Sequence, residues 1–455
     1  MYSSEKEWPV IQNETKIGYS ETVPADKQYW PVVVIGAGVA GITAAHTVAL
    51  TGTGVLLLER GPYPGSKNMS GGAVYSLPTR ELVPDFWQDA PVERTLVNQQ
   101  YWLLTENSAV KLGYTGYNFD NPPYNKFSIM RATFDRWYAA KAEEAGVTLW
   151  TGCKADSLIL KKGRITGVRV SGSREGDIYS GIIILAQGVN PILAEEAGLI
   201  RKGAAKNYSL YMKEMIALPE EVINQRLMLK ERQGAVIGLL GDATAGLIGA
   251  GSLYTFKEHL GINAGVSVRT LAQKKVNIAF ILDRLKKNPA IEPLIDGGTV
   301  VERTAHMIPE GGFNAIPPLV FDGMLIAGDS AGLVNGTHGL NLAMYSGNFA
   351  AQTALEALEK KDFSRSTLYR YRERLENSFV LKDMRANRRV PGWFSRNPTL
   401  VADYISLINH VSMQVSTVYP ISRKEKRRLI RREVLDRQPP GKLLADLVQA
   451  IWSSK

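Results

Sequence analysis

Cysteine and histidine are scarce in this sequence. Its 455 residues include one cysteine, Cys153, and five histidines. A single thiol cannot form a disulfide framework, and it cannot supply the several ligands that an iron–sulfur cluster or a cysteine-based zinc site requires. The histidines are scattered, and the sequence shows neither a nucleophile elbow nor a metal-spaced histidine pair. Nucleophilic and metal-dependent catalysis therefore have no visible signature in it.

Long apolar runs are also missing. The longest candidates, Pro31–Ile35 and Gly181–Ala186, fall well short of the roughly 18–20 residues of a membrane-spanning helix. The first thirty residues are polar and lack the basic start and apolar stretch of a secretory signal. We therefore expect residues 1–30 to form an extended arm. We expect the protein in the cytoplasm, including a peripheral position on the cytoplasmic face of a membrane.

Acidic residues are few in the last fifth of the chain. The whole chain has 54 Lys and Arg against 44 Asp and Glu, a net charge of +10. Residues 361–455 hold 20 of these basic residues and 9 of the acidic ones, so the rest of the chain is nearly neutral. The composition, 45% hydrophobic and 22% charged, is that of an ordinary globular protein, and the length suits two or three domains.

A glycine-rich turn near the start is the most informative short motif. Gly36, Gly38 and Gly41 form a G-x-G-x-x-G between an apolar strand and an alanine-rich helix, and a second apolar strand ends at Glu59. This βαβ context is the one in which such a motif binds a dinucleotide. Gly36 allows the tight turn, Gly38 lets the backbone approach a pyrophosphate, and Gly41 allows the helix to pack closely on the sheet. Glu59 is placed to accept hydrogen bonds from an adenosine ribose.

A second motif far downstream distinguishes FAD from NAD. A strand runs into Gly328 and Asp329, and a long helix is predicted over Gly339–Lys360. In flavoproteins with two dinucleotide-type halves, such an aspartate binds a ribitol hydroxyl, and the next helix points its positive N-terminus at the flavin. A NAD dehydrogenase has no use for this second half, so we predict FAD. Arg131, at the head of a predicted helix, either pins the cofactor or pairs with Asp135 on the surface.

Together these motifs resemble those of the geranylgeranyl reductase-like FAD superfamily. Within it they are similar to the electron transfer flavoprotein–quinone oxidoreductases, in particular the C subunit of the Fix/Etf electron-bifurcating complex. The resemblance runs from about residue 31 to about residue 390. It is carried by the segments Glu59–Gly72, Lys213–Val222, Ser252–Thr255, Met307–Phe313 and Gly328–Asp329. One departure is Ala186-Gln187-Gly188, where the family often has Ala-Asp-Gly.

The resemblance implies a fold and a reaction. The fold is α/β (α+β overall), a two-dinucleotide-type FAD fold with an inserted antiparallel-sheet substrate domain and a helical C-terminal region. The reaction passes electrons from an electron transfer flavoprotein to a membrane quinone. Single-chain enzymes of this family carry a C-terminal cluster domain with four cysteines, which this chain lacks. The resemblance therefore implies a separate ferredoxin-like iron–sulfur subunit.

The motifs and the resemblance also divide the chain. We expect an N-terminal arm, a discontinuous FAD-binding domain, a quinone or substrate domain and a basic helical C-terminal region. The arm is 1–30, and the FAD-binding domain comprises 31–75, 131–205 and 301–360. The quinone or substrate domain comprises 76–130 and 206–300, and the C-terminal region is 361–455. The predicted cofactor-binding residues are Gly36, Gly38, Gly41, Glu59, Arg60, Gly71, Gly72, Arg131, Ala155, Gly188, Gly328, Asp329, Gly336, Thr337, Gly339, Leu340 and Asn341.

Several of these residues have specific expected roles. By the resemblance, the strand around Ala155 passes beside the adenine. The helix N-terminus at Gly339 can stabilise negative charge on the reduced flavin. The side chains of Thr337 and Asn341 can donate further hydrogen bonds, and Gly71 and Gly72 let the backbone approach the ring. His338 is a candidate proton relay to the quinone; the alternative is a structural histidine with satisfied hydrogen bonds.

The C-terminal region combines apolar helix faces with a cluster of basic residues. Apolar residues recur at helical spacing over 400–415 and again over 443–452, and Arg423–Arg432 between them is strongly basic. Such a pattern suits an anionic membrane surface, with the protein bound peripherally, or a docking face for acidic partner subunits. Ordinary core helices with a solvated charge run are the alternative. Nucleic acid is disfavoured, because no aromatic residues are interleaved with the charges.

Other functions remain open at this point. An isoprenoid (geranylgeranyl) reductase of the same superfamily is the first alternative, although Ser70-Gly71 stands where such enzymes often have Cys-Gly. An NADPH-dependent aromatic monooxygenase is the second, and Gln187 counts against it. A flavin-free scaffold subunit is the third, and the absence of yellow colour on purification would distinguish it.

Overall fold

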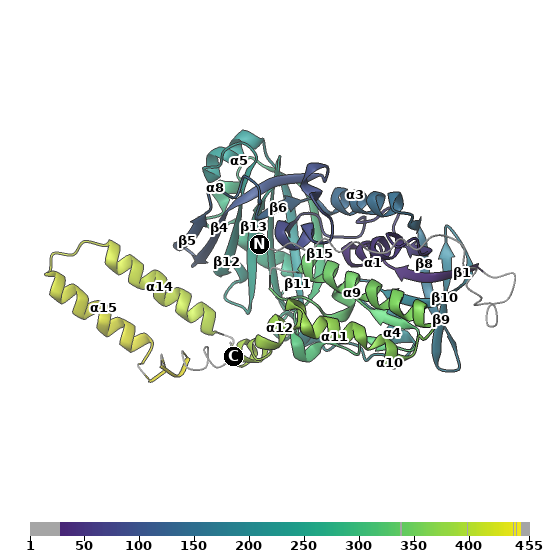
Figure 1. The fold of residues 1–455 in the computed structure, drawn as a ribbon. Coiled ribbons are helices and arrows are strands. Elements are labelled where there is room, and N and C mark those ends of the chain that lie inside the picture. Colours follow the sequence, from purple (N-terminus) through teal and green to yellow (C-terminus); the bar gives the residue numbers. More distant parts are fainter. Residues whose placement is uncertain (1–27, 337–338, 398, 440, 443, 447–455) are drawn as a thin grey trace, which may run out of the picture.

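The computed structural model describes residues 28–336, 339–397, 399–439, 441–442 and 444–446. Within these residues, two sheets and the helices packed on them form the body, and one pair of helices projects from it (Figure 1). The first sheet has eight strands and the second has nine. This arrangement confirms the expected α/β fold with a second, largely antiparallel sheet.

The first sheet has a parallel centre that is buried on both faces. Its strand order is β16-β17-β10-β1-β2-β7, with β9 and β8 continuing from β10 in antiparallel pairing. Val32, Val33 and Val34 have no exposed surface, which explains the continuous apolar run seen in the sequence. The strands are β1 Gln28–Ile35, β2 Val55–Leu58, β7 Thr148–Trp150, β8 Cys153–Lys161, β9 Arg164–Gly172, β10 Gly176–Leu185, β16 Val320–Phe321 and β17 Met324–Ile326. Because β1 begins at Gln28, the last residues of the expected arm belong to the sheet.

Three helices pack together beside this sheet: α1 (Val39–Ala49), α3 (Arg131–Glu144) and α9 (Gly339–Lys360). The bounds of α9 are those expected from the sequence. α1 and α9 approach so closely that a Cβ built on Gly347 would lie 2.1 Å from the carbonyl oxygen of Ala40. Shorter helices are also present, and several of them contact α9. They are α2 Ser76–Arg80, α4 Ile192–Glu196, α10 Arg365–Leu368, α11 Arg370–Asn377, α12 Phe379–Ala386 and α13 Val390–Arg396.

The second sheet runs β15-β11-β14-β13-β12-β4-β6-β3, with β5 paired to β4. Most neighbours are antiparallel, and β4 and β12 are parallel. β3 and β15 belong to this sheet, although the boundaries expected from the sequence grouped them with the cofactor domain. The strands are β3 Gly72–Tyr75, β4 Val92–Leu104, β5 Ala109–Thr115, β6 Lys126–Ile129, β11 Tyr208–Ala217, β12 Gln233–Gly241, β13 Gly249–Thr255, β14 His259–Ser267 and β15 Thr299–Pro309.

The two faces of the second sheet differ in character. One face forms a separate apolar core with the helices α5 (Glu220–Leu227), α6 (Val268–Lys274), α7 (Ile278–Lys286) and α8 (Glu292–Ile295). In β11, Leu210 and Met212 pack on this core. Because side chains alternate along a strand, Tyr211 and Lys213 point to the opposite face. That opposite face, rather than the apolar core, is the one that meets the residues around Gly71.

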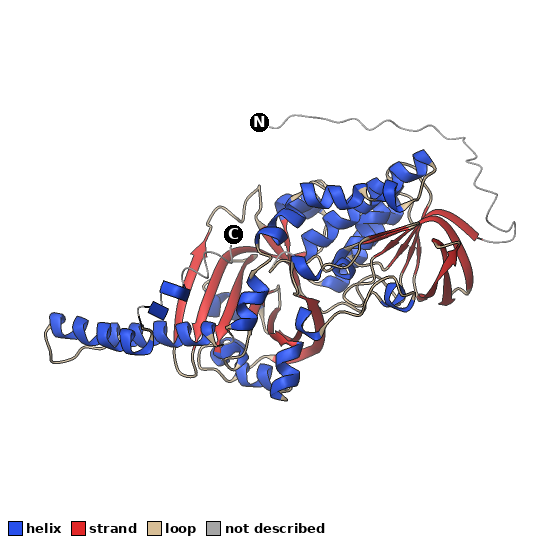
Figure 2. Ribbon diagram, turned by 90° about the horizontal axis from the view of Figure 1, so that it is seen from below, coloured by secondary structure: helices blue, strands red, loops and turns tan. Residues whose placement is uncertain are grey.

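The C-terminal helices α14 (Leu400–Ser416) and α15 (Arg423–Arg437) form a hairpin that extends away from the body (Figures 1 and 2). The start of α14 packs on β4, β5 and β12. The apolar face expected for 400–415 is divided in the structure: Ile405 is buried, whereas Ile408 is 40% and Val415 is 62% exposed. Much of the second expected apolar face, 443–452, lies outside the described residues. Within the described residues, every helix is too short or too polar to cross a bilayer.

Candidate functional site

The early glycine turn is shaped by backbone contacts that exclude any side chain. Gly36 has φ +104°, and a Cβ built on it would lie 2.3 Å from the carbonyl oxygen of Ala186. Its N–H donates to the carbonyl of Leu58 at 2.8 Å. A Cβ on Gly41 would lie 1.9 Å from the carbonyl oxygen of Gly36. Both positions therefore require glycine, and they place the start of α1 directly over the ends of the central strands.

Gly38 differs from its two neighbours because it faces open space. It is the N-cap of α1 in an extended conformation, and its position has no protein atom within 4 Å of an added Cβ. The first turn of a helix has N–H groups without intrahelical partners, and these carry partial positive charge. The turn at Gly38 is therefore a cradle that fits an anionic group such as a pyrophosphate.

Glu59 joins the end of β2 to this turn. Its Oε2 accepts a hydrogen bond from the N–H of Ala37 at 3.0 Å, and its Oε1 accepts one from Gly61 at 2.6 Å. The Glu59 backbone carbonyl also accepts from the N–H of Cys153, which brings the start of β8 alongside. Ala155 lies two residues further along β8 and is partly buried, whereas Arg60 is exposed. The carboxylate thus stands at the edge of the Gly38 cradle.

The late turn at Gly328 and Asp329 closes the opposite side. Gly328 has φ +66°, and a Cβ there would lie 2.9 Å from the Cβ of Ala40 in α1. The hydroxyl of Ser330 donates to the carbonyl of Gly188 at 2.7 Å, which ties this turn to the one after β10. Burial raises the pKa of Asp329, and the positive charge of Arg131 opposes this shift. Gly188 and Gly336, like Gly38, face open space.

Arg131 occupies the first position of α3 and is held by an acidic partner. Its Nε and Nη2 donate to the two carboxylate oxygens of Asp135 at 2.9 and 2.7 Å. Asp135 is completely buried and also accepts from Asn68 at 2.7 Å. The structure therefore contains the expected Arg–Asp pair, but places it inside the protein. The pair fixes the guanidinium near enough to Asp329 to influence its pKa.

The side chain of Asn341 is held by protein partners. Its side-chain amide is buried, accepts from the N–H of Tyr75 at 3.1 Å and donates to the hydroxyl of Thr79 at 2.8 Å. These bonds attach α9 to the strand β3 and to α2, so the Asn341 side chain is committed to protein contacts. Leu340 lies beside Gly72: its Cδ1 is 3.6 Å from a Cβ built on that glycine. The remaining contribution of this helix end comes from Gly339 and the backbone.

One histidine expected at the site is not described by the structure, and a second histidine lies near Arg131. His338 and Thr337, the candidate relay and its neighbour, lie outside the described residues. The sequence indicated His338 as the one histidine beside the flavin, but His306 of β15 also reaches this region. Burial lowers the pKa of His306, and the positive charge of Arg131 lowers it further. Nothing in the local sequence around His306 marked it, because its position depends on the pairing of β15 with β11.

The second sheet contributes a lysine that sequence reasoning did not single out. Lys213 of β11 is buried, and its Nζ donates to the carbonyl of Gly71 at 2.9 Å. The Nζ lies 5.5 Å from the ring centre of Tyr254 and 5.4 Å from that of Phe256. The contact ties β11 to the segment just before β3, at the residue expected to let the backbone approach the flavin.

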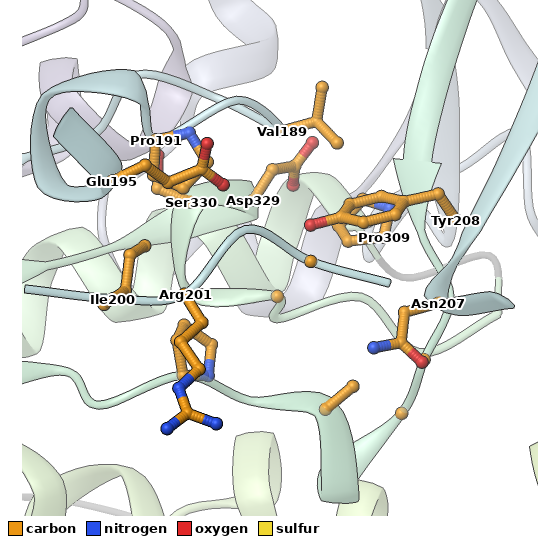
Figure 3. Close-up of a pocket in the computed structure, with 16 residues that line it drawn as sticks. Val189, Pro191, Glu195, Ile200, Arg201, Asn207, Tyr208, Pro309, Asp329 and Ser330 are labelled. Atoms are coloured by element: carbon orange, nitrogen blue, oxygen red, sulfur yellow. The ribbon is translucent and has the colours of Figure 1, made fainter. Parts of the chain in front are cut away.

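A pocket lies beside the late turn (Figure 3). Asp329 and Ser330 form one wall, and Tyr208 projects into it from the opposite side. The segment after β10 and the residues following β15 complete the lining. Among the described residues, no group of three His, Cys, Asp or Glu side chains is arranged to hold a metal ion.

Comparison with known proteins agrees with this geometry. Residues 31–194 match the model of the FAD-dependent oxidoreductase family, and residues 390–454 match that of the ETF-QO/FixC family C-terminal domain. A geranylgeranyl bacteriochlorophyll reductase-like protein from Thermoplasma acidophilum has the same fold, with a TM-score of 0.71 at 20% identity over 90% of this chain and 98% of that one. The chain is therefore an FAD-dependent oxidoreductase.

Curated relatives define the family more narrowly. Protein FixC of Azotobacter vinelandii is 39% identical over 407 residues, covering 89% of this chain and 94% of that protein. Protein FixC of Escherichia coli K12 is 37% identical over 391 residues, covering 85% and 90%. The chain belongs to the FixC family, which confirms the resemblance and gives the protein a role in FAD-dependent electron transfer.

Proposed function

We propose that this chain takes electrons from an electron transfer flavoprotein, through a ferredoxin-like iron–sulfur subunit, and passes them to a membrane quinone. The observation that carries the proposal is the contact between Lys213 and Gly71. It places the polar and aromatic face of the second sheet directly beside the residues expected to flank the flavin. A quinone on that face would lie at the short distance that electron transfer requires.

The FAD would lie along the line from the early turn to the late turn. The Gly38 cradle suits the pyrophosphate, because backbone N–H groups there have space for an anion. Glu59 would accept hydrogen bonds from the adenosine ribose beside Ala155, and Asp329 would bind the ribitol. Gly71, Gly72 and Leu340 would border the ring. FAD supplies a carrier that exchanges electrons singly or in pairs, and these residues bind it, orient it and exclude water.

The quinone would enter from the side of the second sheet. Glycines on its cleft face make room for large side chains: a Cβ on Gly238 would lie 2.9 Å from the ring of Tyr101. Tyr254 lies in the same face, where burial raises its pKa to about 12, so its hydroxyl keeps its proton at neutral pH. An apolar ring surface with a few hydrogen-bonding groups is what a quinone head requires.

The projecting hairpin would attach the protein to the membrane and account for a position on the cytoplasmic face. At its tip, Val418 is 94% and Val415 is 62% exposed. The hairpin is nevertheless well built, because Lys426 donates to the carbonyls of Val415 and Thr417 at 2.9 and 2.6 Å. An exposed apolar tip beside a basic helix suits a surface of anionic lipids.

The experiment that tests this function is reconstitution. The FAD-loaded chain is combined with an electron transfer flavoprotein, the iron–sulfur subunit and a short-chain quinone, and quinone reduction is followed by absorbance under anaerobic conditions. We expect reduction only when all the proteins are present. Reduction directly by NADPH would contradict the proposal. Saturation of an isoprenoid double bond would favour the alternative function, that of a prenyl reductase.

A further inference from the structure

Lys213 is enclosed on several sides although it is a basic side chain. A Cβ built on Gly71 would lie 2.7 Å from its Nζ, and one on Gly261 would lie 2.9 Å from its Cε. The rings of Tyr254 and Phe256 enclose the ammonium as well. Lysine is rarely buried without a charged partner in direct contact, because the charged form loses its hydration. A lysine in this position therefore needs a specific reason.

The groups around Lys213 influence whether its side chain is protonated. β15 contributes Glu302, whose negative charge acts on the ammonium and whose Oε1 accepts from the N–H of Ser70 at 3.4 Å. β13 contributes the ring of Tyr254, and the paired residue on β14 is the neutral Asn263. Burial lowers the pKa of Lys213 to about 7, and Glu302 opposes the shift.

Two further titratable groups come from the next rung of the same sheet. They are Tyr211 on β11 and its pairing partner His306 on β15. Burial raises the pKa of Tyr211, so its hydroxyl stays neutral near pH 7, and burial lowers the pKa of His306. Of these groups, Lys213 is the one that contacts Gly71, so it is the one placed to gain a proton when negative charge arrives beside that residue.

We propose that Lys213 is a positioning residue that fixes the Gly71 carbonyl beside the flavin and takes up a proton when electrons arrive there. The inference rests on the proposed flavin site. In the balance, two electrons come from the reductant and one proton follows them into the cofactor, which leaves one negative charge there. One further proton moves from solvent to the neutral Lys213 amine. The resulting ammonium compensates the added negative charge. Glu302 and Lys213 together hold the two consecutive residues Ser70 and Gly71.

Proton counting during reduction of the FAD-loaded chain tests this inference. The protein is reduced anaerobically with a dye-mediated electrode at weak buffering, without quinone or partner proteins, and the protons taken up per two electrons are measured from about pH 6 to about pH 9. Above about pH 7, where the amine is neutral before reduction, the unmodified protein should take up one proton more than at the acid end. Lys213→Arg carries a permanent positive charge and is expected still to donate to Gly71, so it should lose the additional proton. Lys213→Met should lose it as well.

A matched control comes from the other buried lysine of this sheet. Burial lowers the pKa of Lys126 to about 8, so Lys126→Met tests whether any buried lysine produces the effect. We expect Lys126→Met to keep the additional proton. If Lys213→Arg also keeps it, Lys213 does not have this role, and the Arg variant decides the matter if the Met variant fails to fold. If the unmodified chain binds no FAD, the proposed flavin site itself is wrong.

Discussion

The carboxylate of Glu59 and the N–H of Ala37 are joined by a 3.0 Å hydrogen bond that spans the two halves of the early βαβ unit. The second oxygen of the carboxylate accepts from Gly61 at 2.6 Å. Glu59 therefore fixes the cradle turn, at the position where we propose that the adenosine ribose binds. A carboxylate oxygen has two lone pairs, so these backbone bonds leave capacity for a ribose hydroxyl.

Replacing Glu59 should weaken FAD binding. A hydrogen bond to a charged acceptor contributes about 1.5–3 kcal/mol, so Glu59→Gln should reduce FAD affinity about ten- to a hundredfold. Glu59→Ala should also lower the free energy of unfolding of the apoprotein, because it leaves Ala37 and Gly61 without their acceptor. Quenching of flavin fluorescence measures the affinity, and the exposed Glu175→Gln provides the control. Unchanged affinity in Glu59→Gln would show that the ribose lies elsewhere.

Substitution by alanine should have different effects at two glycines of the early turn: it should lower FAD affinity at Gly38 and stability at Gly36. Gly38→Ala places its methyl in open space, so the apoprotein should unfold at the same denaturant concentration, while FAD affinity falls at least about tenfold. Gly36→Ala meets the Ala186 carbonyl at 2.3 Å with φ +104°, which should destabilise the apoprotein by more than about 2 kcal/mol. Urea unfolding and FAD titration of both variants separate the two effects. Equal FAD affinity in Gly38→Ala and the unmodified chain would place the pyrophosphate elsewhere.

The parts of the site that could be predicted from sequence are those fixed by local backbone geometry. Gly36 and Gly41 are required by contacts within a few residues or with the adjacent strand end, so a short motif identifies them. A long helix from about Gly339 to about Lys360, following the Gly328–Asp329 turn, was likewise predicted, and α9 has these bounds. Glu59 was identifiable because it ends the second strand at a fixed spacing from the turn.

Residues whose role depends on distant partners could not be predicted. Asn341 binds Tyr75, which is 266 residues away, and a sequence pattern cannot tell whether a buried amide serves the ligand or the backbone. Lys213 reaches Gly71 across 142 residues, and lysines are normally solvated. In α14, periodicity alone could not show that Ile405 packs on the body while Val415 extends beyond it. In each case the packing of strands and helices determines which partner the side chain meets.

The basic helix α15 should determine binding to anionic membranes. Arg427, Arg428 and Arg431 are exposed, and each basic residue near an anionic surface contributes about 1 kcal/mol. Reversing all three to Glu should therefore weaken binding to phosphatidylserine-containing vesicles by at least about a hundredfold. Vesicle sedimentation measures this binding, and added salt should also weaken the binding of the unmodified protein.

A control with the same change of charge separates the local effect from the global one. Lys230, Lys257 and Lys274 are exposed residues in the part of the chain that builds the second sheet and its helices, and their reversal to Glu alters the net charge equally. We expect this variant to bind vesicles much more tightly than the α15 variant. Equal loss in both would show that net charge alone, rather than the hairpin, controls binding.

Lys126 should make the stability of the fold depend on pH in the alkaline range. Its side chain is 5% exposed in β6, bonds to Gln99 and lies 5.5 Å from the ring centre of Tyr75. Burial lowers its pKa from 10.5 to about 8. Between these two values the unfolded chain binds more protons than the folded one, so stability rises with pH, by up to about 1.4 kcal/mol per pH unit. Below about pH 8 both states carry the charge, and this contribution to the slope disappears.

Lys126→Met isolates this contribution from other groups that titrate in the same range, including Lys213. The methionine side chain has no charge to bury, so the variant should be more stable than the unmodified protein near pH 7, and the difference should shrink as the pH rises from about 8 towards about 10. Urea unfolding at several pH values measures the difference. Lys274→Met, which changes an exposed lysine, should show no such trend. A stability difference that stays constant with pH would mean that Lys126 keeps an ordinary pKa in the folded protein.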